Sequence, residues 1–111
     1  MKNLGEIKKI ILDTAEFHPL HKSWINLAQT LSKIYNLELE IKTEDYLFAI
    51  SYGDKDDIGM AWLPQLFAQM SDGKIILLMS QYPFDPSTTK PSDSMALEEG
   101  KKKIEELKKD P

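Results

Sequence analysis

The order of three segments near the N-terminus most strongly limits the folds open to this chain. Residues 20–35 carry apolar side chains every three or four positions, which is the period of an α-helix with one buried face. Residues 8–14 before them form a short apolar run typical of a buried strand. Residues 37–42 alternate apolar and charged side chains, as a half-buried strand does. A strand, a helix and a second strand in this order predict a right-handed parallel unit.

The second half of the chain adds two strands and two helices to this unit. Residues 66–70 and 74–80 are apolar runs joined by a turn whose Asp-Gly pair is typical of a tight hairpin. Residues 45–52 are expected to form a short helix, although their aromatic side chains also alternate as along a strand. After a long polar loop over 80–93, a last helix capped by Ser92, Asp93 or Ser94 is expected to run to about Lys109.

This order of elements predicts a single domain over residues 1–111. Its fold class is α/β, with a mixed four-stranded sheet flanked by helices in three layers. No apolar run approaches the roughly 20 residues that a membrane-spanning helix needs, so we expect a cytoplasmic protein that does not bind membranes. The cysteine-free composition, rich in lysine, glutamate and isoleucine, is compatible with a thermophilic source.

The charged residues and the absence of cysteine exclude several classes of function. All 14 basic residues are lysine and the formal net charge is -4, which argues against nucleic-acid binding because arginine is the usual reader of phosphate and guanine. Without cysteine the chain has no disulfide, no thiolate metal site and no thiol redox chemistry.

Two histidines, His18 and His21, flank Pro19 between the first strand and the helix that follows. Pro19 fits the first turn of that helix, where a proline loses no helical hydrogen bond. The two rings would lie close enough to share a metal ion such as zinc, but zinc needs three or four protein ligands. A carboxylate would have to complete the site, and the candidates are Asp13, Glu16 and Asp57. The other interpretation is that both histidines are polar surface residues at the start of a helix.

The segment DTAEFHPLHK, residues 13–22, resembles the active-site segment of the thioredoxin family, in which an aspartate, Ala-Glu-Trp and Cys-Gly-Pro-Cys-Lys follow one another. His18 and His21 stand where that family has its two cysteines, and Pro19 takes the first middle position, as in glutaredoxins. Further along, MAWLPQLF, residues 60–67, is similar to the family's segment that ends in a cis-proline, here Pro64. The resemblance covers roughly residues 8–78 and the last helix, and it implies a thioredoxin-like fold.

The resemblance implies the shape of a binding site without the family's chemistry, because no residue here supplies the sulfur for thiol–disulfide exchange. In that family the residue before the cis-proline presents its backbone to an extended peptide, which pairs with it as a strand would. The surface expected to bind comprises His18, Pro19, His21, Trp62, Leu63 and Pro64. Four aromatic residues are expected to form an apolar patch around it: Phe17, Trp24, Trp62 and Phe84.

We therefore expect a non-redox interaction module that needs no cofactor and binds an unidentified protein or peptide. The sequence leaves other enzyme activities open and excludes only thiol–disulfide oxidoreductase activity, because cysteine is absent. The different-class alternative is a metal-binding or metal-dependent protein, with zinc held by His18 and His21. A third interpretation is a homodimer in which this face is buried. Asp13 follows an apolar run, so it is expected either to be partly buried with a raised pKa or to cap a turn at the strand end.

Overall fold

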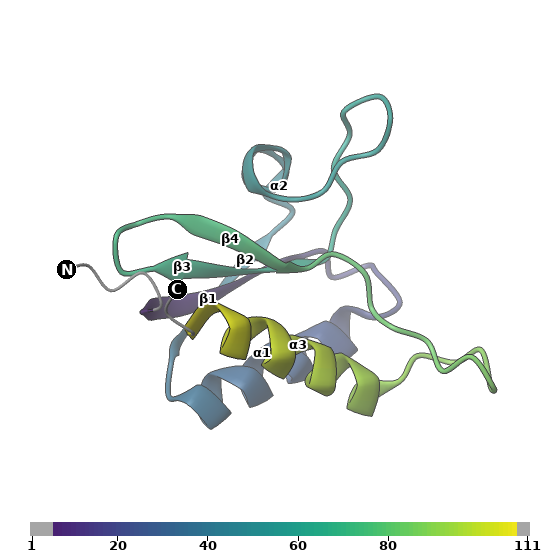
Figure 1. The fold of residues 1–111 in the computed structure, drawn as a ribbon. Coiled ribbons are helices and arrows are strands. Elements are labelled where there is room, and N and C mark those ends of the chain that lie inside the picture. The colour runs from purple at the N-terminus through teal and green to yellow at the C-terminus, as the bar shows by residue number, and fades with distance from the viewer. Residues whose placement is uncertain (1–5, 109–111) are drawn as a thin grey trace.

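The computed structural model describes residues 6–108 and shows a four-stranded mixed sheet with helices on both faces (Figure 1). The strands are β1 (Ile7–Thr14), β2 (Glu38–Thr43), β3 (Gln65–Met70) and β4 (Ile75–Met79), and the helices are α1 (His21–Tyr35), α2 (Tyr46–Tyr52) and α3 (Asp93–Lys108). The sheet order is β2-β1-β3-β4, with β1 parallel to β2 and the other two pairs antiparallel. The predicted α/β class and the mixed four-stranded sheet are confirmed.

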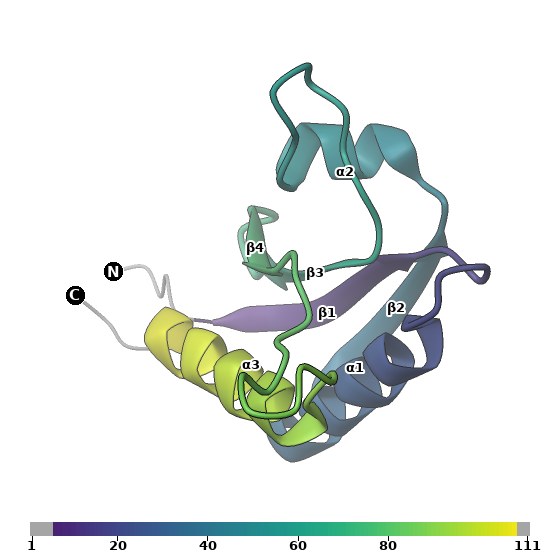
Figure 2. The ribbon, with the colours of Figure 1, turned by 90° about the vertical axis from the view of Figure 1, so that its right-hand side faces the viewer.

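The two long helices and the short helix lie on opposite faces of the sheet. Figure 2 shows α1 and α3 side by side below it and α2 above it. The main core fills the space between α1, α3 and the sheet, where Leu12, Trp24, Leu31 and Ile104 are at most 2% exposed. Burying each such side chain contributes roughly 1.5–3 kcal/mol. Because side chains alternate along a strand, Asp13 points away from this core and toward the α2 side.

The ends of the helices follow from their capping residues. Asp45 accepts a hydrogen bond from the Phe48 N–H at 3.1 Å and begins α2, so the expected helix over this segment is confirmed. The Ser92 hydroxyl accepts from the Met95 N–H at 3.2 Å and caps α3. The expected end of that helix at Lys109 lies outside the described residues.

The placement of Pro19 in the first turn of α1 was wrong. The helix begins at His21, and Pro19 lies in the turn that precedes it. The reason is local, since the His21 N–H donates to the His18 carbonyl at 3.0 Å and closes a separate turn before the helix starts.

Gly100 sets the distance between α1 and α3. A Cβ atom at this position would lie 2.7 Å from the Leu31 Cδ1 atom, and Leu31 is fully buried. We expect Gly100→Leu to push the helices apart and to lower the free energy of unfolding by about 2 kcal/mol. Lys101→Leu, at an exposed neighbouring position, is the control and is expected to change it by less than about 0.5 kcal/mol. Urea denaturation measures both, and equal effects would contradict the close helix contact.

Candidate functional site

A groove of about 460 Å³ opens at the end of the sheet where β1 finishes and β3 begins. Three segments far apart in the sequence line it: the turn before α1 together with α1 itself, the segment before β3, and the start of the loop after β4. They meet because Asp13, near the end of β1, pairs with Gln65 at the start of β3. Figure 2 shows the loop after β4, in green, crossing in front of the sheet toward α3. The lining residues are His18, Leu20, Trp24, Trp62, Leu63, Pro64, Ser80, Gln81, Tyr82 and Phe84.

Four of the six residues expected to bind lie together in this groove: His18, Trp62, Leu63 and Pro64. The Leu63–Pro64 peptide bond is cis. The other two, Pro19 and His21, do not line the groove. Pro19 is exposed on the preceding turn, whereas the His21 ring is held against the end of β1 by the Thr14 hydroxyl, 2.9 Å from Nδ1.

The two histidines have different hydrogen-bond partners. His18 Nδ1 accepts from the Leu20 N–H at 3.0 Å, so the proton of the neutral ring is on Nε2. A ring in that state has no free lone pair on Nε2 for a metal ion. Within residues 6–108 no group of three or more histidine, aspartate and glutamate side chains is placed to hold a metal, so Asp13, Glu16 and Asp57 do not complete the expected zinc site.

Aromatic side chains form much of the groove wall. Trp24 is 2% exposed and packs edge-on against Tyr82, with ring centroids 5.4 Å apart. Burial raises the pKa of Tyr82 well above its usual range, so its hydroxyl stays protonated and donates to Asp93 at 2.6 Å. Phe84 lies at the rim, 51% exposed, whereas Phe17 is 73% exposed and outside the groove. Of the four residues expected in the aromatic patch, Trp62 and Phe84 line the groove, Trp24 lines it as part of the main core, and Phe17 lies outside it.

Gln65 fixes the segment that carries Trp62, Leu63 and Pro64. Its side chain is fully buried, and its Oε1 accepts from the Asp54 N–H at 2.9 Å. Its Nε2 donates to the Trp62 carbonyl at 2.7 Å and to the Asp54 carbonyl at 3.1 Å. Sequence reasoning missed Gln65, because a glutamine after a proline carries no periodic signal.

A second set of hydrogen bonds joins two walls of the groove. The Trp62 indole N–H donates to the Ser80 carbonyl at 2.8 Å, and the Ser80 hydroxyl donates to the Asp54 carboxylate. The loop after β4 is thereby held against the segment before β3. The loop over 80–93 is long enough to be expected over a site, but the sequence does not single out Tyr82 and Ser80, because this polar loop has no pattern that tells which of its residues turn inward.

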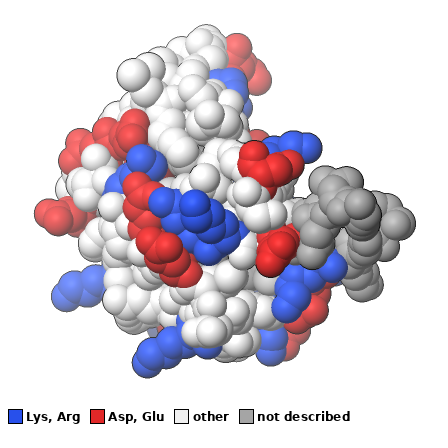
Figure 3. Space-filling model, turned by 90° about the vertical axis from the view of Figure 1, so that its left-hand side faces the viewer, with Lys and Arg blue, Asp and Glu red and all other residues white. Residues whose placement is uncertain are grey.

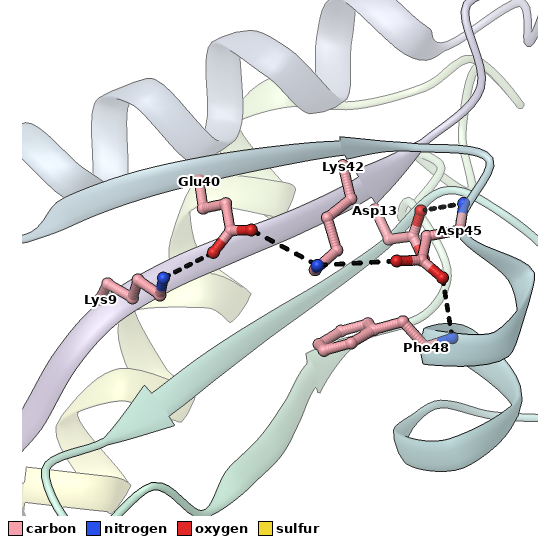
Figure 4. A network of polar contacts seen from close by, with 6 residues as sticks. All are labelled: Lys9, Asp13, Glu40, Lys42, Asp45 and Phe48. Carbon is pink, nitrogen blue, oxygen red and sulfur yellow. Dashed lines mark hydrogen bonds and ion pairs between the residues drawn. The ribbon is translucent and has the colours of Figure 1, made fainter.

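Asp13 lies beside Asp45, the residue that precedes α2 (Figure 4). It is fully buried, and its Oδ1 accepts from the Asp45 N–H at 3.1 Å, while Oδ2 has no hydrogen-bond partner among residues 6–108. Burial raises the pKa of Asp13 from 3.8 to about 6, an effect that the Asp45 N–H partly offsets. The prediction of a buried, pKa-shifted carboxyl is confirmed.

Lysines and carboxylates on the same side of the sheet form a chain of contacts that leads to Asp13. Lys42 Nζ lies 3.4 Å from a Glu40 oxygen and 3.6 Å from an Asp45 oxygen (Figure 4). The hydrogen bond from Lys9 lowers the pKa of Glu40. All of these charges are partly exposed, so each pair contributes at most about 1 kcal/mol.

The groove differs in charge from the rest of the surface. None of its lining side chains is lysine, aspartate or glutamate. Acidic and basic side chains are interspersed over the face shown in Figure 3, without a continuous basic surface. The groove is therefore suited to an uncharged, apolar segment of a ligand.

No family model and no curated protein matches the sequence. Within the described part of the chain, no helix has the length and apolar character required to cross a membrane.

Proposed function

We propose that this chain is a thioredoxin-like domain without redox chemistry, and that it binds an extended peptide in the groove beside His18 and Pro64. The observation that carries the proposal is the convergence of His18, Trp62, Leu63 and Pro64 on one uncharged groove. The resemblance of the sequence to the thioredoxin family predicts a binding site at these positions. The sheet order, with one parallel pair and an antiparallel hairpin, supports the same family.

The backbone of Leu63 favours a peptide over a compact small molecule. Among residues 6–108, neither its N–H nor its C=O has a hydrogen-bond partner. An extended peptide can satisfy both groups by pairing as a strand, which supplies affinity that does not depend on the side chains of the peptide. One of those side chains then enters between Trp62, Tyr82 and Phe84, where aromatic walls favour an aromatic or branched aliphatic group.

Selection of random octapeptides on the immobilised protein tests this function. We expect the selected peptides to share one aromatic or branched aliphatic residue and to lack charges next to it. Phe84→Ala removes an aromatic ring from the groove rim and is expected to weaken binding of a selected peptide about tenfold, measured by calorimetry.

Phe17→Ala is the matched control, because Phe17 is also an exposed phenylalanine but lies outside the groove. It is expected to leave the affinity unchanged within about twofold. Failure to select any peptide, or equal losses in the two variants, would contradict the proposal.

A further inference from the structure

We propose that the free edge of strand β2 joins two copies of this chain into a symmetric dimer. The two β2 strands pair antiparallel across a two-fold axis that passes between Ile41 of each copy. In this register Glu40 lies opposite Lys42 of the second copy. No residue of β2 lines the groove, so the inference does not depend on the proposed peptide binding.

Strand β2 is the outermost strand on its side of the sheet. The sheet order is β2-β1-β3-β4, and among residues 6–108 β2 pairs with β1 alone. A strand directs its N–H and C=O groups to both sides, so about half of those of β2 point away from β1. Within the described part of the chain, residues 38–43 make no backbone hydrogen bond beyond this pairing. Such a row of unpaired groups is a template for another strand.

Ile41 is the apolar side chain at the centre of this edge. It lies on the same face of the sheet as Leu39, since side chains alternate along a strand. Leu39 packs against the main core, whereas Ile41 is 42% exposed. A second copy with its own Ile41 directly opposite removes this apolar surface from water and forms a β-branched cross-strand pair.

The charges on the opposite face of β2 select the register. A two-fold axis perpendicular to the sheet passes between two identical residues, because directly opposed residues lie on the same face. An axis at Ile41 pairs residues 39–43 and places Glu40 opposite Lys42 twice. An axis at Glu40 would oppose two glutamates, and one at Lys42 would oppose two lysines. Opposite charges stabilise a pair of strands, whereas like charges destabilise it.

The end of β2 removes the one unfavourable pair from this register. Glu38 would lie opposite Glu44 of the second copy, but β2 ends at Thr43. Glu44 has a φ of 51°, so the chain leaves the direction of the strand there. The paired segment therefore stops before these two carboxylates oppose each other.

The contacts of Glu40 and Lys42 within one copy leave both charges available. Lys42 Nζ lies 3.4 Å from a Glu40 oxygen and 3.6 Å from an Asp45 oxygen, both longer than an ordinary hydrogen bond (Figure 4). Its ammonium group has three donors, so it can also donate to Glu40 of the second copy. The Glu40 side chain is 36% exposed, although Lys9 donates to one of its oxygens.

Sedimentation equilibrium of the full chain measures the assembly. A contact through one short strand is smaller than the interface of a permanent dimer, so we expect a reversible equilibrium between monomer and dimer. The dissociation constant is expected to be roughly 10–100 μM.

Charge reversal tests the register. Glu40→Lys places like charges opposite each other at both symmetric pairs, and so does Lys42→Glu. Each variant alone is expected to raise the dissociation constant about tenfold or more. An equimolar mixture of the two variants restores opposite charges at both pairs, so we expect a heterodimer that forms as readily as the dimer of the unmodified chain.

Glu106→Lys and Lys101→Glu are the matched controls, because they make the same changes of net charge on the exposed side of α3. Alone or mixed, they are expected to leave the dissociation constant unchanged within about twofold. Circular dichroism shows whether each variant is folded; all four substitutions change side chains that are at least partly exposed.

Three results would overturn the inference. The unmodified chain could remain monomeric up to about 1 mM, which excludes an edge contact of this kind. A dimer that folded Glu40→Lys and Lys42→Glu leave unchanged would use another face. Folded variants that lose the dimer singly but do not recover it when mixed would show that Glu40 and Lys42 do not oppose each other across the axis.

Discussion

Replacing Gln65 with leucine is expected to lower the free energy of unfolding by about 3 kcal/mol and to remove peptide binding. The substitution keeps an apolar volume in a fully buried position but deletes three hydrogen bonds, one to the Trp62 carbonyl and two to the Asp54 backbone. These hydrogen bonds hold the segment before β3 in place. Without them the segment loses its order, and Trp62, Leu63 and Pro64 move away from the groove wall.

Gln69→Leu is the matched control for this substitution. Gln69 lies on the same strand, is only half-buried, and makes no side-chain hydrogen bond among residues 6–108. We expect the free energy of unfolding of the Gln69→Leu variant to stay within about 0.5 kcal/mol of that of the unmodified chain, and we expect the variant to bind peptide. Urea denaturation and calorimetry of both variants measure the difference. A Gln65→Leu protein with normal stability and affinity would show that the buried amide does not organise the site.

Replacing Asp13 with asparagine is expected to stabilise the protein by about 2 kcal/mol at pH 8 and to have little effect at pH 4. Burial raises the pKa of Asp13 from 3.8 to about 6 in the folded protein, so the carboxyl binds its proton more tightly when folded. Its contribution to stability is therefore complete below pH 3.8 and is lost as the pH rises through about 6. Asparagine keeps an acceptor for the Asp45 N–H without the buried charge.

The pH profile of stability, measured by urea denaturation between pH 4 and pH 8, tests this account of Asp13. Asp57→Asn removes the same charge from an exposed position and is expected to follow the profile of the unmodified chain. If Asp13→Asn destabilises the protein at pH 8, the ionised carboxylate has a stabilising partner and the account of its burial is wrong.

The regular elements could be predicted because their patterns depend on burial of one face. The alternation over residues 37–42 reflects burial of Leu37 and Leu39, which pack against the main core, whereas Ile41, the next apolar residue of the pattern, is 42% exposed. Helix α1 shows its period because Trp24 and Leu31 face the sheet. The helix α2 was harder to predict, since Tyr46, Phe48, Ile50 and Tyr52 also fit the alternation of a strand. The Asp45 side chain, which caps the first turn, stabilises the helix.

The site was only partly predictable for a physical reason. His18, Leu63 and Pro64 were found through short motifs, but the groove also depends on Tyr82 and Gln65, which are defined by tertiary hydrogen bonds. The periodic spacing of apolar residues in a segment does not indicate such tertiary hydrogen bonds. The missing third metal ligand is a similar case, because which carboxylates approach the histidines depends on the path of the whole chain.

The most direct test of peptide binding is a heteronuclear NMR titration of the ¹⁵N-labelled protein with a selected octapeptide. The account predicts saturable shifts centred on the Leu63 amide and the Trp62 indole, with contacts from an apolar peptide side chain to Phe84. Shifts centred on the exposed side of α3, or contacts that leave Leu63 and Trp62 unchanged, would contradict it.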